Sequence, residues 1–390
     1  MEKYHFAKRF QENCEGSVIA EAIKGADHMA DLINFSIGDP DFNTDQEIIE
    51  QTFQDVKAGA THYTDSQGLL QLRELLGEFY AEAYNLKVTP EEIMITTSGC
   101  HAMVLALMAI LDPGDEVLLF EPYFSLYKEQ VELAGGRVVS CPSDPDKGFR
   151  LDIQQLVACV SEKTKALILN TPCNPSGVCL SNDEMQQLAD FAIQHDLIVI
   201  ADDIYTLYSY ETAFTPIMSY QGMRERTITV SSFSKDYCMT GWRIGYIAAD
   251  QSLIQIVRKI NDAIVYSAPA PSQWAAIHAL QLRDKIQPLL KAEFEKRCRY
   301  AYERINACSY LSAIKPQGSI YLFVDVRQTG CTSKQFCERL LKKAHILVLP
   351  GVDSGKSGEG FVRFAMTLGI DKMKTAFDRI DQLTVTDFML

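Results

Sequence analysis

Short apolar runs alternate with amphipathic stretches through the middle of the chain, and this alternation predicts an α/β fold. The runs are nearly continuous in apolar residues, which indicates a mostly parallel central sheet flanked by helices on both faces. The expected strands are 93–96, 116–120, 165–170, 197–201, 227–230 and 244–248, and the expected helices are 101–111 and 182–195. Ser181 is the expected N-cap of the second helix, because acidic residues follow it in the first turn.

A different pattern begins near residue 283, where a long charged stretch without strong breakers predicts one helix over 283–307. We interpret this helix as a bridge to a second, smaller unit. The strands expected in that unit are 319–326, 346–349 and 361–366, with helices over 333–343 and 371–383. The mixture predicts a smaller α+β domain.

Composition and charge narrow the class of protein. The chain has 390 residues, 47% of them apolar, which is enough for a large core and two domains. Its net charge of −14 lacks long runs of one sign and argues against a nucleic-acid or anionic-membrane partner. The eleven cysteines match no zinc-binding spacing and indicate reduced thiols without a metal site. A secretory leader and an apolar stretch of about 18 residues are both lacking, so a cytoplasmic location is expected.

The segment 229–246 carries the most specific chemistry. Lys235 follows an apolar run and lies among small hydroxyl residues, so its amine is expected to be poorly solvated and nucleophilic toward a carbonyl. Ser232, Ser234 and Arg243 suit a phosphate. A Schiff-base amine beside a phosphate site indicates an aldehyde cofactor with a phosphate, which is pyridoxal phosphate. The plainer interpretation, a solvated lysine after an edge strand, leaves the flanking residues unexplained.

The strand over 197–201 ends in polar residues. Asp202, Asp203 and Tyr205 follow it directly, so one acid is available to a pyridine nitrogen and the phenol to a ring oxygen. Because functional residues of a parallel sheet collect at the carboxyl ends of its strands, we expect these side chains at the site.

Two further strand ends point to the same edge of the sheet. The strand over 165–170 leads to a loop with two prolines and Asn174, a sequence that is also typical of a plain turn. The strand over 93–96 leads to Gly99 at a helix start, where free N–H groups and the helix dipole favour an anion. A simple helix cap explains the second segment equally well.

The order of these motifs resembles that of the class I/II aminotransferases, pyridoxal-phosphate enzymes of the aspartate aminotransferase superfamily with fold type I. The resemblance covers nearly the whole chain. The matching segments are 36–41, 62–68, 98–100, 121–124, 174–177, 202–205, 232–235, 241–245 and 362–364. It implies a large cofactor-binding domain over 47–283 and a small domain made of 1–46 and 284–390.

The resemblance implies roles for residues around the cofactor ring. Lys235 would form the Schiff base and move the proton between the substrate Cα and the cofactor C4′. Asp202 would keep the pyridine nitrogen protonated, so that the ring accepts electrons. Tyr205 and Asn174 would hydrogen-bond the ring oxygen, and Phe124 would stack on the ring.

Other implied contacts are with the phosphate and the substrate. The phosphate would be held by Ser232, Ser234, Arg243 and the backbone N–H groups of Gly99 and Cys100, with Tyr63 reaching over from a second subunit. Arg363 would clamp the substrate α-carboxylate, because its planar fork matches carboxylate geometry. Asn174 and Gly38 would line the same subsite.

Some of these residues have a second interpretation. Asp203 is an alternative ring partner, although Asp202 has the family's spacing to Tyr205. Phe124 and Trp242 are also suited to core packing.

The segment 351–360 departs from the family pattern. Its Gly355-Lys356-Ser357 echoes the end of a phosphate-binding loop, but proline stands at position 350 where that motif needs glycine. We expect a mobile surface loop here.

The resemblance implies a ping-pong aminotransferase that moves the amino group of an L-amino acid to a 2-oxo acid, in a homodimer. A C–S β-lyase acting on cystathionine or cysteine conjugates is the alternative, but the segment 241–243 favours transamination. A ligand-sensing module of a transcription regulator is a hypothesis from another class, which the charge of −14 disfavours.

The preferred amino acid stays open at this stage. Aspartate-directed members of the branch often carry lysine where this chain has Cys100, which disfavours a dicarboxylate substrate. Ile37, Tyr123 and Tyr266 suit a neutral or aromatic-tolerant pocket and are equally suited to packing.

Overall fold

A seven-stranded sheet forms the centre of the computed structural model, which describes residues 7, 29 and 31–388. In spatial order its strands are β2 (Ile93–Thr96), β8 (Gly245–Ala248), β7 (Thr227–Ser232), β6 (Ile198–Asp202), β5 (Thr164–Leu169), β3 (Glu116–Phe120) and β4 (Arg137–Cys141). The pairs from β7 to β4 are parallel, whereas β8 is antiparallel to both of its neighbours. The prediction of a mostly parallel α/β sheet is confirmed.

The reversed strand β8 has a consequence for the loop before it. Because β8 begins at the edge where β7 ends, the connection 233–244 stays at the carboxyl edge of the sheet. Strand β2 pairs antiparallel with β8, so it ends at that same edge. The segments that carry Lys235, Arg243 and Gly99 are thereby brought to one place.

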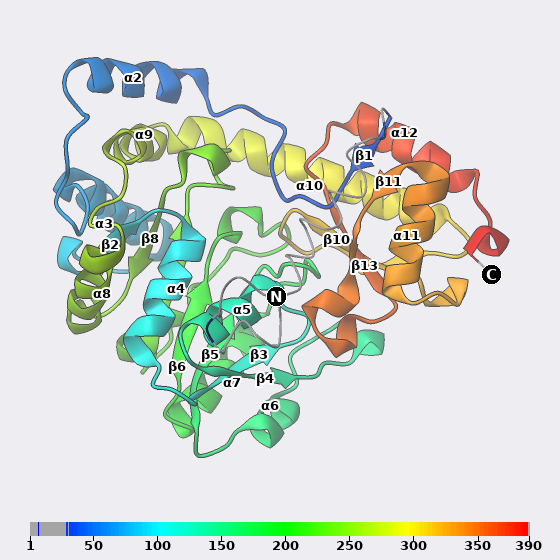
Figure 1. Cartoon of the computed structure of the whole chain (residues 1–390), viewed down its shortest axis with the longest axis horizontal. Coiled ribbons are helices and arrows are strands. Elements are labelled where there is room, and N and C mark those ends of the chain that lie inside the picture. The colour runs from blue at the N-terminus through cyan, green and yellow to red at the C-terminus, as the bar shows by residue number, and fades with distance from the viewer. Residues whose placement is uncertain (1–6, 8–28, 30, 389–390) are drawn as a thin grey trace, which may run out of the picture.

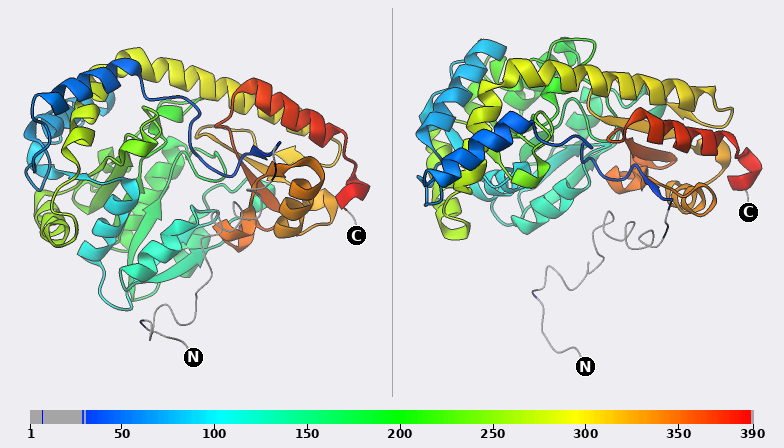
Figure 2. Two further views of the ribbon diagram at one scale, coloured as in Figure 1. Left: turned by 45° about the horizontal axis from the view of Figure 1, so that its top comes forward. Right: turned by 90° about the horizontal axis from the view of Figure 1, so that it is seen from above.

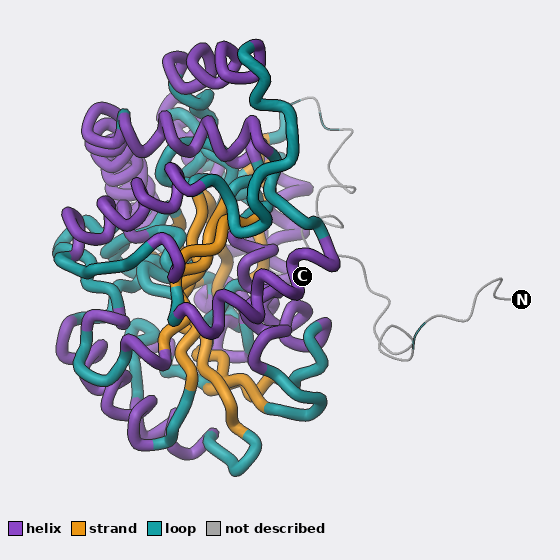
Figure 3. The backbone as a smooth tube through the Cα atoms, turned by 90° about the vertical axis from the view of Figure 1, so that its left-hand side faces the viewer, coloured by secondary structure: helices purple, strands orange, loops and turns teal. Residues whose placement is uncertain are grey.

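Helices cover both faces of this sheet, because successive strand residues point to opposite sides. Leu119 packs among α4 (Gly99–Ile110), α5 (Leu126–Leu133) and α8 (Gln251–Ile264). Leu118 packs on the other face, among α6 (Ile153–Cys159) and α7 (Asn182–Gln194). The helices near β2 are α2 (Gln46–Lys57), α3 (Leu70–Tyr84) and α9 (Ala270–Gln281). Figure 3 shows the strands in the interior with helices on either side.

The long helix α10 (Arg283–Ala307) runs from α9 to the second part of the molecule (Figures 1 and 2). Its 25 residues correspond to about 37 Å at the usual rise per residue. The predicted bounds of this helix are confirmed. Among the described residues, no helix is both long and apolar enough to cross a membrane.

The second part contains a four-stranded antiparallel sheet. Its strands, in spatial order, are β12 (Leu349–Pro350), β13 (Phe361–Ala365), β10 (Tyr321–Asp325) and β9 (Ser312–Ala313). Helices α11 (Ser333–Ala344) and α12 (Ile370–Asp381) pack on it. The strands expected at 319–326 and 361–366 and both expected helices are confirmed, with ends shifted by one to two residues.

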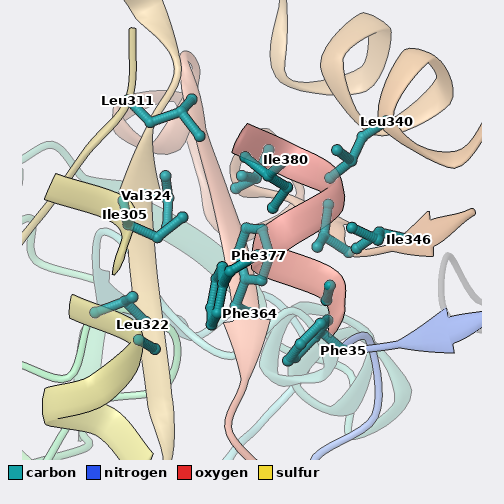
Figure 4. Close-up of a cluster of buried hydrophobic side chains, with 14 of the residues drawn as sticks. Phe35, Ile305, Leu311, Leu322, Val324, Leu340, Ile346, Phe364, Phe377 and Ile380 are labelled. Atoms are coloured by element: carbon teal, nitrogen blue, oxygen red, sulfur yellow. The ribbon is translucent and has the colours of Figure 1, made fainter. Parts of the chain in front are cut away.

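A short N-terminal strand completes the core of this second part. Strand β1 (Ile33–Asn34) pairs in parallel with β11 (Ile346–Leu347). Phe35, fully buried, contacts the rings of both Phe364 and Phe377, at centroid distances of 5.3 and 6.1 Å (Figure 4). The burial of this aromatic side chain fixes the chain just before the segment 36–41, which leads toward α2.

The segment 351–360 differs from its expected form as a mobile surface loop. It folds into two 3₁₀ turns, Gly351–Ser354 and Lys356–Gly358, and three of its glycines are buried. A Cβ at Gly358 would lie 2.2 Å from the carbonyl oxygen of Gly351, so the two turns pack directly on each other. Glycine permits a close backbone approach that a sequence pattern alone does not reveal.

Candidate active site

A pocket of about 330 Å³ opens at the carboxyl edge of the seven-stranded sheet, where segments from both sheets meet. It is lined by Ile37, Gly38, Asp39, Ser98, Gly99, Cys100, Phe124, Asn174, Ile204, Tyr205, Ser232, Ser234, Lys235, Thr240, Arg243, Tyr321 and Arg363. Of the residues predicted to contact the cofactor or the substrate carboxylate, only Asp202 and Tyr63 are not part of this lining. Residues more than 200 positions apart in sequence therefore share one pocket.

Lys235 extends from the loop after β7 into the pocket. Ser232 and Ser234 on either side of Phe233 are buried, and Lys235 is half-buried. Its Nζ donates a hydrogen bond to the carbonyl oxygen of Gly38, which belongs to the N-terminal segment. The amine is thus held inside the pocket by the opposite wall, where it can meet a bound carbonyl.

One end of the pocket is suited to an anion. Helix α4 begins at Gly99, and the Ser98 hydroxyl caps it by accepting from the His101 N–H at 3.3 Å. A Cβ at Gly99 would lie 2.8 Å from Ile204, so glycine lets the helix start approach the wall closely. The free N–H groups at this helix start face the same space as Arg243 and favour a phosphate-sized anion.

Arg243 is the exposed cation of this end. Its backbone is in the left-handed region, with φ of 52°, and its Nη1 donates to the carbonyl oxygen of Thr240 at 2.8 Å. The Thr240 hydroxyl in turn donates to Asp39 at 2.6 Å. Ser232 and Ser234 add two hydroxyls to the same lining, so the predicted phosphate ligands are together.

Asp202 lies behind the pocket wall at the end of β6. Its Oδ2 accepts a hydrogen bond from Tyr127, whose ring meets Phe124 of the lining edge-on at 5.5 Å. Its buried Oδ1 has no partner among the residues that the structure describes. Burial raises the pKa of this carboxyl to about 6, although the Tyr127 hydroxyl works in the opposite direction. A buried, unpartnered carboxylate oxygen is suited to a cationic ligand.

Asp203 points elsewhere, as expected for the next residue after a strand. It lines a separate cavity of about 20 Å³ together with Tyr80, Tyr84 and Tyr246. Burial, and secondarily the charge of Asp202, raises the pKa of Asp203 to about 8. The geometry favours Asp202 over Asp203 as a partner of a ligand in the large pocket.

The other end of the pocket is built around Arg363 of β13, which is only 7% exposed. Its Nη1 donates to Asn174 Oδ1 at 3.0 Å, and its Nη2 donates to the carbonyl oxygen of Ser36. Its guanidinium carbon lies 4.6 Å above the Tyr321 ring. The Nε has no partner among the described residues, which leaves one buried donor for a ligand.

Tyr321 joins three of the predicted residues. Its hydroxyl is 3.0 Å from that of Tyr205, and its ring underlies Arg363. A Cβ at Gly38 would lie 2.0 Å from the Tyr321 hydroxyl, so only glycine allows the N-terminal segment to cross here. These contacts explain why residue 38 is glycine. Its own carbonyl oxygen is the acceptor for the Lys235 amine.

Several predicted residues lie outside this pocket. Tyr63 is 86% exposed and meets the Tyr266 ring edge-on at 5.3 Å. Tyr123 lines a different, enclosed cavity of about 40 Å³ beneath the wall. Trp242 is half-buried and donates to the Thr44 hydroxyl at 3.0 Å, so it is a packing residue with a polar contact. Ile37 does line the pocket.

Sequence reasoning missed two tyrosines near the site. Tyr127 lies in the first turn of α5, but Phe124 precedes the helix, so the helical spacing of three does not apply to this pair. The two residues are joined by a turn in which the Tyr127 N–H donates to the Phe124 carbonyl oxygen at 3.0 Å, and no sequence pattern indicates this contact. Tyr321 follows a glycine-containing turn in the four-stranded sheet, and nothing nearby in sequence links it to Tyr205. Thr240 and Asp39 were also missed as lining residues.

Comparison with known proteins gives consistent results. The family model described as "Aminotransferase class I and II" matches residues 30–380. An aspartate aminotransferase of Pyrococcus abyssi is 40% identical, covering 91% of this chain and 92% of that protein. The aromatic-amino-acid aminotransferase 2 of Thermococcus litoralis is 36% identical, covering 94% and 93%.

Solved structures agree with these relatives. The crystal structure of an aromatic aminotransferase from Pyrococcus horikoshii OT3 is similar with a TM-score of 0.88 at 37% identity, covering 93% of this chain and 98% of that one. The aspartate aminotransferase from Thermus thermophilus with maleate has a TM-score of 0.91 at 30% identity, covering 97% and 99%.

Proposed function

We propose that this chain, which belongs to the class I and II aminotransferase family and is an aminotransferase, works with pyridoxal 5′-phosphate bound through Lys235. The relatives do not favour the alternative of a C–S β-lyase. The observation that carries the proposal is the meeting of a half-buried amine, an anion-binding helix start and a buried arginine in one pocket.

The residues present fit this cofactor. The pocket volume of about 330 Å³ accommodates a substituted pyridine ring with its phosphate. Ser232, Ser234, Arg243 and the N–H groups of Gly99 and Cys100 supply phosphate donors at one end. The unpartnered Oδ1 of Asp202 suits a protonated ring nitrogen. When bound, the cofactor supplies an electron sink for the charge that forms at the substrate Cα.

The chain's own groups then have defined tasks. Lys235 holds the cofactor covalently and, once released, carries the proton between the substrate Cα and the cofactor C4′. Asp202 keeps the ring nitrogen protonated, because its carboxylate is buried and favours a cation nearby. Tyr205 and Asn174 would donate to the ring oxygen, and Phe124 would stack on the ring face.

Arg363 binds the α-carboxylate of the amino acid and of the 2-oxo acid that replaces it. Its partners Asn174 and the Ser36 carbonyl fix the orientation of the guanidinium, and Gly38 leaves room beside it. Ile37 and the acidic Asp39 also line the pocket, a combination that supports a substrate with an uncharged side chain. A 2-oxo acid accepts the amino group in the second half of a ping-pong cycle.

We also propose a homodimer in which Tyr63 serves the neighbouring subunit's phosphate. The exposed pair Tyr63 and Tyr266, together with exposed Leu70, Ile264 and Val265, supports such an apolar contact. Sedimentation equilibrium measures the assembly directly.

The division into a domain over 47–283 and a domain of 1–46 and 284–390 remains our proposal, and part of 1–46 lies outside the described residues. A cytoplasmic location is proposed as well. It is supported by the cysteines within the described residues, which are all free.

The decisive experiment adds single L-amino acids to the purified holoenzyme and follows cofactor absorbance and products. A stoichiometric 2-oxo acid with the amino group retained on the cofactor is expected, whereas pyruvate, ammonia and a free thiol would indicate the β-lyase. Lys235→Ala should lower turnover by at least about a thousandfold, and replacing the exposed Lys374 of α12 by alanine should leave turnover unchanged. Borohydride reduction should attach the cofactor to Lys235; attachment to another lysine would refute the assignment.

A further inference from the structure

We infer that Glu121 is a positioning residue that locks the four-stranded sheet onto the seven-stranded sheet and so sets the spacing between Phe124 and Arg363. The inference rests on the proposed roles of those two residues. Glu121 directly follows β3, and the residue is only 3% exposed. A buried carboxyl group is costly unless its oxygens are hydrogen-bonded, so its partners are informative.

The two carboxylate oxygens of Glu121 bind different parts of the molecule. Oε1 accepts from the Ser140 hydroxyl, which belongs to β4 of the same sheet. Oε2 accepts from the backbone N–H of Ser357 at 2.7 Å. Ser357 lies in the segment 351–358, here called the latch loop, which connects β12 to β13. One buried side chain therefore bridges the two sheets.

Two further hydrogen bonds reinforce the bridge. The Tyr123 N–H donates to the carbonyl oxygen of Ser354 at 3.0 Å, and the Ser143 N–H donates to the Ser357 hydroxyl at 3.1 Å. Both run from the seven-stranded sheet's loops to the latch loop. The latch loop is thus bound by three hydrogen bonds around Glu121, which is more than incidental surface contact.

Gly355 makes the close approach possible. Its φ is +112°, and a Cβ there would lie 2.5 Å from Cδ of Glu121. Any larger residue would have to push the carboxylate away from the Ser357 N–H. Gly114, in the turn before β3, has a similar φ of +97° but has nothing within 4 Å of a Cβ. The two glycines have similar φ values and differ in their neighbours, so they form a matched pair.

The bridge reaches both ends of the pocket. Glu121 precedes Phe124 by three residues, and Phe124 meets Tyr127, the hydrogen-bond donor to Asp202. On the other side the latch loop leads directly into β13, which carries Arg363. Loosening the bridge therefore separates the ring-stacking wall from the carboxylate-binding arginine without touching either.

The conservative variant Glu121→Gln tests whether the hydrogen bonds of Glu121 matter or only the volume of its side chain. An ionised carboxylate only accepts hydrogen bonds, whereas glutamine keeps one accepting oxygen for the Ser357 N–H and offers its NH₂ to the Ser140 oxygen. Glu121→Gln should therefore preserve the bridge, and Glu121→Ala should remove it. A purely structural role predicts lower thermal stability for Glu121→Ala with an unchanged KM.

The test compares Glu121→Ala, Glu121→Gln, Gly355→Ala and the control Gly114→Ala as holoenzymes in steady-state kinetics. We expect Glu121→Ala and Gly355→Ala to raise KM for the amino acid about tenfold while kcat changes less than about threefold. Glu121→Gln and Gly114→Ala should stay within about twofold of the parent. If Glu121→Ala does not fold, the two glycine variants decide alone.

Two results would overturn the inference. Equal KM values for Gly355→Ala and Gly114→Ala would show that the approach to Glu121 does not matter. A Glu121→Gln enzyme with a KM as high as that of Glu121→Ala would exclude the hydrogen-bonded bridge. Neither result touches the proposed function, which fails only if the parent enzyme does not transaminate or if Lys235 is not the residue bound to the cofactor.

Discussion

The two ends of the pocket are built from the same kinds of groups but hold them in different states. At the phosphate end, the start of α4 and the exposed Arg243 present donors toward the pocket space. At the substrate end most donors are already engaged: Arg363 binds Asn174 and the Ser36 carbonyl, and Lys235 binds the Gly38 carbonyl. Among the described residues, the Arg363 Nε has no partner. One end therefore presents free donors to a ligand, whereas most donors at the other end are hydrogen-bonded within the protein.

The difference teaches how binding free energy is distributed. A ligand at the phosphate end forms hydrogen bonds with groups that already face the pocket, so few hydrogen bonds within the protein have to be broken. A ligand that engages Lys235 must replace an existing protein hydrogen bond, and only the surplus contributes to affinity. A molecule that cannot replace the hydrogen bonds of these paired groups binds weakly, which favours specificity at the substrate end.

The largest effect is expected from replacing Arg363 at the substrate end. Arg363→Lys keeps the positive charge but loses the planar fork, which should cost about 3 kcal/mol, roughly a hundredfold in kcat/KM. Steady-state kinetics with the preferred amino acid measures it. Arg297→Lys is the control, because Arg297 is equally buried but pairs with Asp41 at 2.7 Å outside the pocket. Unchanged kcat/KM in Arg363→Lys would contradict the proposed carboxylate site.

A smaller effect is expected at the cofactor end, where the affinity for the cofactor should depend on pH. The pKa of Asp202 in the free protein is about 6, raised by burial, and a protonated ring nitrogen prefers the ionised carboxylate. Cofactor affinity should therefore be nearly full above pH 7, about half of full at pH 6, and roughly fivefold lower again at pH 5, because binding then expels a proton.

Quenching of tyrosine and tryptophan fluorescence on titration with cofactor measures this affinity without turnover. Asp202→Asn should bind more weakly at pH 8 and lose the part of the pH dependence that Asp202 causes. The titration of the cofactor's own phosphate affects both proteins alike. Identical slopes for the two proteins below pH 6 would rule out Asp202 as the titrating partner.

The smallest effect concerns the contact between the two ends. Tyr321→Phe removes the hydroxyl 3.0 Å from that of Tyr205 but keeps the ring beneath Arg363. The loss of one hydrogen bond of about 1 kcal/mol should lower kcat/KM roughly fivefold. Tyr210→Phe removes a comparable bond to the Ser319 carbonyl outside the pocket and should leave kcat/KM unchanged. Equal effects from both variants would argue against a special role for Tyr321.

The cofactor end was the more predictable part of the site, for a physical reason. Its residues follow parallel strands directly, and such strands end at one edge, so local patterns around Gly99, Asp202 and Lys235 sufficed to predict that they meet. Their roles remain predictions. Tyr321 was not predicted as a site residue because its neighbours Tyr205 and Gly38 come from distant segments of the sequence. The packing that joins them is a property of the tertiary fold.

The same distinction holds for the fold. Helix α10 and strand β3 were predicted with their observed bounds, because one lacks breakers and the other is a continuous apolar run. Strand β4 was missed. Its residues 137–140 are only partly buried or exposed, since it lies at the sheet edge and shows no apolar run. Tertiary pairing with β3 stabilises it where local preference does not.

Adjacent acids at the end of β6 give the wall of the site a charge that changes with pH. The pKa of Asp202 is about 6 and that of Asp203 about 8, and each ionised group opposes ionisation of the other. Near pH 7, midway between these values, the pair mostly holds one proton and one negative charge. As the pH rises from 6 to 8, the charge of the pair becomes more negative by about one unit, so the electrostatic potential behind the ring follows the pH of the solution.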